Sequence, residues 1–183
     1  NILDINEDVF NRSVKLINGF KEYFRDHGEP VSENPSPGNK EGGITTLEDK
    51  SLGCVQKGGI APVVDVLHYG DTVAEKGLNL LDGPGNDIVS ITNLAAAGCH
   101  LILFTTGRGT PLGGAVPTIK VASNGSIAAK KPHWIDFCAF GDDNDQKAKE
   151  LLELVKAVAN GSETCNEINN SREIAIFKDG VTL

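Results

Sequence analysis

Residues 101–110, LILFTTGRGT, decide the fold, because an apolar run passes directly into a glycine-bearing turn. Short runs rich in β-branched and aromatic residues, bounded by Gly, Pro, Asn or His, are typical of buried strands. The same pattern recurs three more times along the chain. We therefore expect four strands, at Val63–Leu67, Leu101–Thr105, Thr118–Ala122 and Trp134–Phe137.

Helical segments alternate with these runs. Apolar residues spaced by three and four predict a long helix from Asp8 to about His27, which Gly28 and Pro30 end. Thr45, three residues before Glu48, has the spacing of a capping box. Further helices are expected at 49–56, 87–97 and 145–159.

Strands that alternate with helices indicate a parallel sheet covered on both faces. The chain of 183 residues is long enough for one domain with a substantial core. We predict an α/β fold: a single three-layer, Rossmann-like domain over 1–183, with a mostly parallel sheet and helices on both faces.

Two segments fit neither element type. Residues 31–43 hold Pro35, Pro37, Gly38, Gly42 and Gly43, too many breakers for regular structure, so we expect a long loop, a feature that is often functional. Residues 173–183 are expected to form a final strand or an extended arm.

Composition excludes several classes of protein. A fraction of 39% hydrophobic and 23% charged residues is that of a globular protein, and no apolar run approaches the length of a membrane span. The net charge of −8 argues against nucleic acid binding, which depends on clustered cations. No secretory leader pattern precedes the first helix, so a cytoplasmic location without membrane contact is expected.

Cysteine and histidine give no metal motif. Cys54, Cys99, Cys138 and Cys165 are widely spaced without a CxxC pair, so reduced thiols are expected rather than disulfides or a zinc site. His68, His100 and His133 are each isolated in the sequence, and a lone histidine is more often an ordinary hydrogen-bonded residue than a ligand. We assign no metal ligand.

Two glycine turns lie where an α/β fold places its ligands. Gly83–Asp87 (GPGND) opens a helix, and Thr105–Thr110 (TTGRGT) follows the carboxyl end of a strand. Glycine lets backbone amides approach a ligand, and a helix start favours an anion. The alternative at the first turn is structural: Asn86 or Asp87 only caps the helix. The binding candidates here are Gly85, Asn86 and Asp87.

The second turn presents Arg108, whose guanidinium suits bidentate contact with a carboxylate, among the hydroxyls of Thr105, Thr106 and Thr110. One guanidinium and several hydroxyls suit a sugar acid. The alternative is that Arg108 pairs with a structural carboxylate. A dinucleotide is disfavoured, because Gly107, Gly109 and Gly113 have GxGxxxG spacing and Pro111 interrupts the helix start.

The densest polar cluster is 34–57, NPSPGNKEGGITTLEDKSLGCVQK. A solvated charged face is the plain interpretation, but a proline- and glycine-rich approach favours a functional site. Its candidates for acid and base chemistry are Lys40, Glu48, Lys50 and Lys57, and its candidates for substrate binding are Asn39, Thr45 and Thr46.

The same stretch resembles the signature of the altronate and galactarate dehydratase family, and so do 77–87 (GLNLLDGPGND), 95–114 (AAAGCHLILFTTGRGTPLGG), 130–136 (KKPHWID) and the tail from Ala159. The tail, with TCNE at 164–167 and GVTL at 180–183, is closer to the altronate branch. The resemblance implies the carboxyl-terminal part of a larger dehydratase whose amino-terminal part is absent here, so that the segment alone is expected to be inactive.

The resemblance further implies a hydro-lyase that converts D-altronate into 2-dehydro-3-deoxy-D-gluconate and water in hexuronate catabolism. It implies a divalent iron or manganese ion, held largely by the amino-terminal part, and a homo-oligomer such as a dimer. Alternatives are galactarate dehydratase or sulfolactate lyase of the same family, or a domain that binds a sugar acid or dimerises without catalysis. We expect the two turns and the polar cluster to converge on one cleft.

Overall fold

The computed structural model describes residues 5–30, 35, 37–41 and 43–180. These residues form two compact units, the first built from 1–83 and 178–183 and the second from 84–177. Both units are α/β and pair their strands in parallel, which confirms the predicted fold class. That the whole chain behaves as one domain stays a prediction. Within the described residues, no helix is long and apolar enough to cross a membrane.

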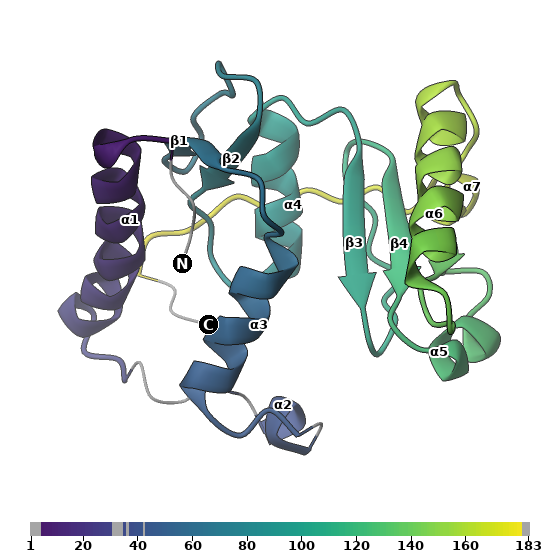
Figure 1. The fold of residues 1–183 in the computed structure, drawn as a ribbon, viewed down its shortest axis with the longest axis horizontal. Coiled ribbons are helices and arrows are strands. Elements are labelled where there is room, and N and C mark those ends of the chain that lie inside the picture. The colour runs from purple at the N-terminus through teal and green to yellow at the C-terminus, as the bar shows by residue number, and fades with distance from the viewer. Residues whose placement is uncertain (1–4, 31–34, 36, 42, 181–183) are drawn as a thin grey trace. The chain divides into compact units, whose positions relative to one another are not determined.

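Unit 1 packs a long helix against a two-stranded parallel sheet. The helix α1 (Glu7–Asp26) begins at the cap Asn6, and β1 (Val63–Leu67) pairs with β2 (Leu78–Leu81). Val9 of α1 lies with Val63 and Val66 in one buried cluster. The apolar spacing along 8–27 predicted the helix correctly, and α1 lies beside this sheet (Figure 1), but of the residues that carry the spacing Val9 is buried while Phe10, Val14, Ile17 and Phe20 are exposed.

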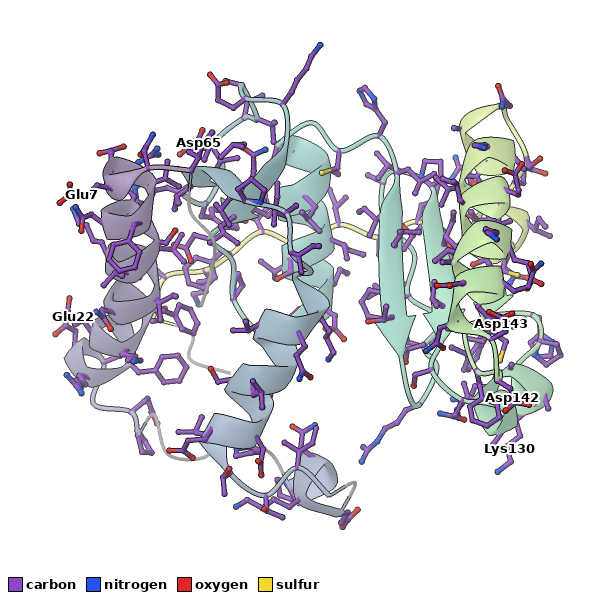
Figure 2. All side chains as sticks on the ribbon, viewed as in Figure 1. Glu7, Glu22, Asp65, Lys130, Asp142 and Asp143 are labelled. Atoms are coloured by element: carbon purple, nitrogen blue, oxygen red, sulfur yellow. The ribbon has the colours of Figure 1, made fainter. Side chains whose placement is uncertain are left out.

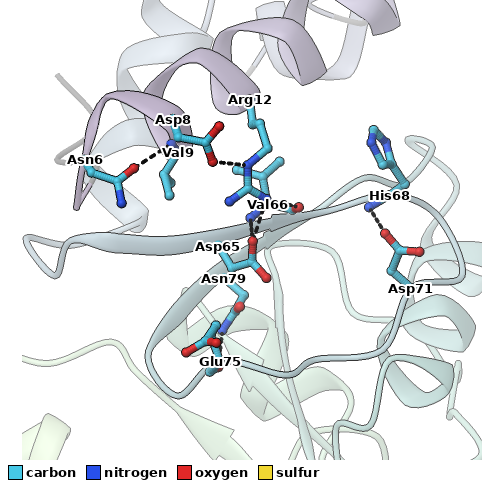
Figure 3. A network of polar contacts seen from close by, with 10 residues as sticks. All are labelled: Asn6, Asp8, Val9, Arg12, Asp65, Val66, His68, Asp71, Glu75 and Asn79. Atoms are coloured by element: carbon cyan, nitrogen blue, oxygen red, sulfur yellow. Dashed lines mark hydrogen bonds and ion pairs between the residues drawn. The ribbon is translucent and has the colours of Figure 1, made fainter.

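A polar network fastens α1 to β1 at the edge of this cluster. The guanidinium of Arg12 donates from Nη1 to Asp65 Oδ1 at 2.6 Å and to the Val66 carbonyl at 3.1 Å, and Nε pairs with Asp8 at 3.0 Å (Figure 3). The hydrogen bond from Arg12 is the main reason that the pKa of Asp65 lies below its ordinary value. Helix and strand are thus joined by both apolar and ionic contacts.

Two shorter helices of unit 1 cover the polar cluster of the sequence: α2 (Pro37–Glu41) and α3 (Leu47–Lys57). The expectation of irregular structure is wrong for 37–41, where Pro37 occupies a first helical position that needs no N–H donor. The cap of α3 is Thr46, not Thr45: its Oγ1 accepts from the Asp49 amide at 3.1 Å. Residues 31–34, 36 and 42 of the expected loop lie outside the described residues.

Unit 2 holds a parallel sheet in the order β3 (Ile102–Thr106), β4 (Thr118–Ala122), β5 (Phe137–Cys138). The expected strands therefore exist, although the last begins three residues late. They divide between two sheets rather than one, because β1 pairs with β2, a strand that the sequence analysis did not predict.

Helices lie on both faces of the sheet in unit 2. On one face, Ile119 and Val121 of β4 pack against Val158 and neighbouring leucines of α6 (Asn144–Ala159), whose cap is Asp143. On the other face, Ile91 of α4 (Asp87–Ala96) lies beside Ile102 and Thr118. Figure 1 shows the resulting three layers of unit 2, and Figure 2 shows Asp142 and Asp143 beside the start of α6.

Two short helices complete unit 2. The helix α5 (Gly125–Lys130) follows β4, and α7 (Cys165–Ile168) begins at a capping box in which Thr164 and Glu167 satisfy each other. Residues 173–177, part of the expected strand or arm, belong to unit 2 but lie in no strand: the Glu173 amide donates to the Gly113 carbonyl and the Ala175 amide to Thr92 Oγ1.

Candidate functional site

The turn after β3 carries the strongest candidate for anion binding. Thr105 and Thr106 end the strand, and Gly107–Thr110 leave it at the carboxyl end of the parallel sheet, where α/β folds place ligands. Gly109 has φ 73°, a left-handed conformation that side chains rarely adopt. The sequence prediction of a strand followed by a glycine turn is confirmed here.

Backbone carbonyls of this turn are held from three sides. Asn124 Nδ2 donates to the Gly107 carbonyl at 3.0 Å, and Lys131 Nζ donates to the Arg108 carbonyl at 2.9 Å. Lys120 Nζ donates to the Thr110 carbonyl at 3.0 Å. The turn is therefore fixed by side chains of β4 and of the segment that follows it, not by its own sequence alone.

Two hydroxyls of the turn act as hydrogen-bond acceptors, and toward the described residues they act only in that way. Thr106 Oγ1 accepts from the Gly109 amide at 2.9 Å, and Thr110 Oγ1 accepts from the Leu112 amide at 3.2 Å. A hydroxyl has one hydrogen to donate besides its acceptor lone pairs. Both threonines can therefore still donate to a ligand oxygen.

Arg108 itself is exposed, and in the part of the chain that the structure describes its guanidinium makes no ion pair. The alternative of a structural carboxylate partner thus finds no support within those residues. An exposed guanidinium on a turn with a fixed backbone is suited to capture a carboxylate.

The start of α4 lies at the same end of unit 2. Because α4 leads into β3 through a short connection, its first turn is placed toward the end at which β3 finishes (Figure 1). Asn86 caps the helix, with Oδ1 accepting from the Val89 amide at 3.4 Å, so the structural interpretation of this residue is correct. Gly85, Asn86 and Asp87 are all exposed, and an added ligand role for them stays a prediction.

The polar cluster of 34–57 belongs to unit 1. The structure joins Asn39 and Lys50, whose Nζ donates to Asn39 Oδ1 at 3.2 Å, and thereby connects α2 to α3. Thr46 is used as a cap, while Lys40, Thr45, Glu48 and Lys57 are exposed. Glu48 in the first turn of α3 and Lys57 in the last also suit the helix dipole, the plain interpretation of both charges.

The described histidines do not belong to a metal-binding cluster. His68 follows β1, and its backbone amide, not its ring, bonds Asp71 Oδ2 at 2.8 Å (Figure 3). Among the described residues, no group of three or more His, Cys, Asp or Glu side chains could hold a metal ion. The four cysteines are free thiols.

Beneath the turn lies a polar cluster that the sequence patterns did not predict, with Lys120 buried and Asp136 and Cys165 half-buried. Lys120 is only 1% exposed, although it lies in the middle of β4. Its backbone amide donates to Asp136 Oδ2 at 2.7 Å, and Asp136 Oδ1 accepts from the Cys165 amide at 2.6 Å. A lysine inside an apolar run of a doubly covered strand was the available signal, because such a side chain must be buried.

Burial changes the acid-base properties of this cluster. Desolvation lowers the pKa of Lys120, and the negative charge of Asp136 opposes that shift. Desolvation, helped by Asp136, raises the pKa of Cys165 to about 11. Cys165 is therefore a protonated thiol near neutral pH, not a nucleophile.

Comparison with known proteins agrees with the resemblance read from the motifs. The profile of the family described as D-galactarate/Altronate dehydratase, C-terminal, matches residues 4–182. An altronate dehydratase of Escherichia coli (strain K12) is 58% identical over 181 residues, and one of Bacillus subtilis (strain 168) is 56% identical over 183 residues. A galactarate dehydratase (L-threo-forming) of Escherichia coli (strain K12) is 35% identical over 152 residues, 82% of this chain and 28% of that protein.

The alignments with the two altronate dehydratases cover nearly all of this chain but a much smaller share of each relative. Each alignment takes in 97% of this chain but 37% of the relative. The chain thus spans little more than a third of the length of these proteins, and corresponds to their carboxyl-terminal part.

Proposed function

This chain belongs to the D-galactarate/altronate dehydratase family, and from that premise we propose that it serves as the carboxyl-terminal part of a hydro-lyase that converts D-altronate into 2-dehydro-3-deoxy-D-gluconate and water. The observation that carries the choice of substrate is the much higher identity to two altronate dehydratases than to a galactarate dehydratase.

The reaction places two demands on a site. A proton must leave C2 and hydroxide must leave C3, while negative charge builds on the carboxylate side of the substrate. Fixed positive groups that oppose this charge are usually the largest contribution to such catalysis. An acid and a base of suitable pKa supply the proton transfers.

Arg108 is the proposed carboxylate ligand. It stands on a turn whose carbonyls are held by Asn124, Lys131 and Lys120, so the position of its backbone is restricted before substrate arrives. The hydroxyls of Thr105, Thr106 and Thr110, together with Gly85, Asn86 and Asp87, are proposed to contact the hydroxyl groups of the sugar acid.

Proton transfer is assigned to the polar cluster of unit 1. Lys40, Glu48, Lys50 and Lys57 are the candidates, and Asn39, Thr45 and Thr46 are candidate binding groups beside them. The hydrogen bond from Lys50 to Asn39 supports a shared role for this pair. Convergence of this cluster with the Arg108 turn on one substrate stays a prediction.

A divalent iron or manganese ion is proposed as the cofactor of the whole enzyme. The described residues do not fit a metal centre, since they bring no three ligating side chains together. We therefore derive no step through a metal here and propose that its ligands come largely from the remainder of the enzyme. The proposed partners are that remainder and a second subunit, and the proposed location is the cytoplasm.

The decisive experiment is a dehydration assay of the full-length enzyme that contains this chain, with D-altronate, galactarate and sulfolactate as substrates and with or without added Fe²⁺ or Mn²⁺. We expect turnover of altronate in preference to the other two, dependent on metal. Preferential turnover of galactarate or sulfolactate would transfer the assignment to another branch of the family.

Two further arms of that assay test the alternative of a domain that does not catalyse. The segment 1–183 alone should show no turnover, because most of the length found in its relatives is missing. If substitutions in the segment left catalysis by the full-length enzyme intact but abolished its oligomer, the segment would be a dimerisation domain instead.

A further inference from the structure

Lys120 is a buried lysine whose amino group is directed at the turn that carries Arg108. The side chain is 1% exposed, and its Nζ donates to the Thr110 carbonyl at 3.0 Å. A lysine is almost never fully buried without a partner, because its charge loses hydration. Burial of Lys120 therefore costs desolvation free energy. If the side chain only filled space, an apolar residue of similar length would do so without that cost.

The surroundings of Lys120 favour retention of its positive charge. Asp136 lies beside it, bonded to its backbone amide at 2.7 Å, and returns a bond from its own amide to the Lys120 carbonyl at 3.0 Å. The carboxylate charge of Asp136 favours the ammonium form against desolvation. Lys120 is buried and Asp136 is half-buried: the carboxylate bonds the Lys120 backbone, while the Lys120 ammonium bonds the turn.

The turn is held from a second direction by Lys131. Its Nζ donates to the carbonyls of Arg108 at 2.9 Å and Gly109 at 3.4 Å and lies 4.7 Å from the ring centroid of Trp134. Three consecutive carbonyls, 108 to 110, thus point to two lysine side chains. Because each carbonyl points to a lysine, the peptide orientation between them is fixed, and Arg108 leaves the turn in a restricted direction.

On this basis, and resting on the proposed function of Arg108, we propose that Lys120 is a positioning residue for sugar-acid binding: it holds the Thr110 carbonyl from within the sheet and so keeps the Arg108 turn in its binding conformation. Lys120 does not touch substrate in this role. Its removal should affect the capture of the carboxylate more than the proton transfers, and so raise KM more than it lowers kcat.

The test uses the full-length enzyme with Lys120→Met, which keeps the length of the side chain but removes its donor. We expect KM for altronate to rise by about tenfold to a hundredfold, the range for loss of a hydrogen bond from a charged group. Lys120→Arg keeps a charged donor and should recover part of the loss. Lys156→Met, an exposed lysine of α6 paired with Glu153, is the matched control and should leave both constants unchanged.

Amide hydrogen exchange provides a readout independent of activity. In Lys120→Met, peptides covering 104–112 should exchange faster, while peptides of α6 should not change. In the wild-type enzyme, 107–112 should exchange more slowly than the exposed segment 72–76, whose amides donate to no backbone carbonyl of the described residues, a comparison that does not need any variant to fold.

Steady-state kinetics and hydrogen exchange together distinguish the positioning role of Lys120 from the binding of substrate at the Arg108 turn. Unchanged exchange over 104–112 in the variant, or fast exchange of the turn in the wild type, would overturn the role of Lys120. Faster exchange with unchanged KM and kcat would confirm that Lys120 holds the turn but refute the binding of substrate there, and with it the positioning role.

Discussion

Asp136 and Cys165, 29 residues apart in the sequence, are joined by a hydrogen bond of 2.6 Å, in which the backbone N–H of Cys165 donates to Oδ1 of Asp136. The other carboxylate oxygen accepts from the Lys120 amide at 2.7 Å. One side chain therefore fastens the first turn of α7 to the central strand of the sheet in unit 2.

Replacement of Asp136 by Ala should destabilise unit 2 markedly, because two backbone amides lose a charged acceptor. A loss of about 2 to 4 kcal/mol is expected, since hydrogen bonds to charged groups contribute about 1.5 to 3 kcal/mol each and are not fully additive. The measurement is thermal unfolding of the full-length enzyme. Asp142→Ala, at an exposed carboxylate labelled in Figure 2, is the control; an equal effect of both would contradict the argument.

Cys165 should react slowly with iodoacetamide at about pH 8, because its raised pKa, about 11, leaves little thiolate. The exposed Cys54 should react at least about tenfold faster, as measured by peptide mass spectrometry. Both should react alike in denaturant. The folded-state pKa of Cys165 lies above the ordinary value of 9.0. The contribution of its protonated thiol to the free energy of unfolding is therefore fully present below pH 9.0 and is lost as the pH rises toward 11. Equal labelling of both thiols in the folded enzyme would refute the assignment.

Arg108→Ala in the full-length enzyme should raise KM or lower kcat by roughly 10- to 1000-fold, because a charge-assisted contact to the substrate carboxylate is lost. Steady-state kinetics with altronate provides the measurement. Arg25→Ala, at the end of α1, removes an arginine far in sequence from the turn and should not change either constant. Wild-type kinetics in Arg108→Ala would eliminate the turn as the carboxylate site.

Arg12→Met should remove an acid-sensitive part of the stability of unit 1. The pKa of Asp65 is lowered chiefly by its hydrogen bond from Arg12, so this contribution is present above the ordinary value of 3.8 and is lost as the pH falls through the folded-state pKa. The wild type should therefore be more stable than Arg12→Met near neutral pH, and the difference should shrink below about pH 4. Urea unfolding at a series of pH values measures it; a difference that does not vary with pH would count against the ion pair.

Local patterns predicted the elements that depend on one segment alone. The spacing of apolar residues placed α1 to within a residue at each end, and the runs at Val63 and Thr118 are the observed strands. Strand β2 was missed because its four residues, LNLL, lack alternation, and only its pairing with β1 makes it a strand. That pairing is also why the strands divide between two sheets.

At the candidate site, too, local patterns predicted only what depends on a single segment. The glycine turn and Arg108 were predictable, because a strand followed by TTGRGT is a local pattern. The groups that hold the turn, Asn124, Lys131 and Lys120, come from 10 to 23 residues further along the chain, and no local pattern connects them to it. The cap of α3 was misplaced by one residue because Thr45 and Thr46 offer the same hydroxyl.

Unit 1 is assembled from two separate lengths of chain, with residues up to 83 completed only by those from Lys178 onward. The Gly180 amide donates to the Tyr23 hydroxyl at 2.8 Å across a separation of 157 residues. A ribosome makes the chain from its amino end, so the whole of unit 2 emerges before that bond can form. The contact between Tyr23 and Gly180 can therefore form only after unit 2 has been synthesised, whereas every residue of 84–177 is available before the last segment of unit 1.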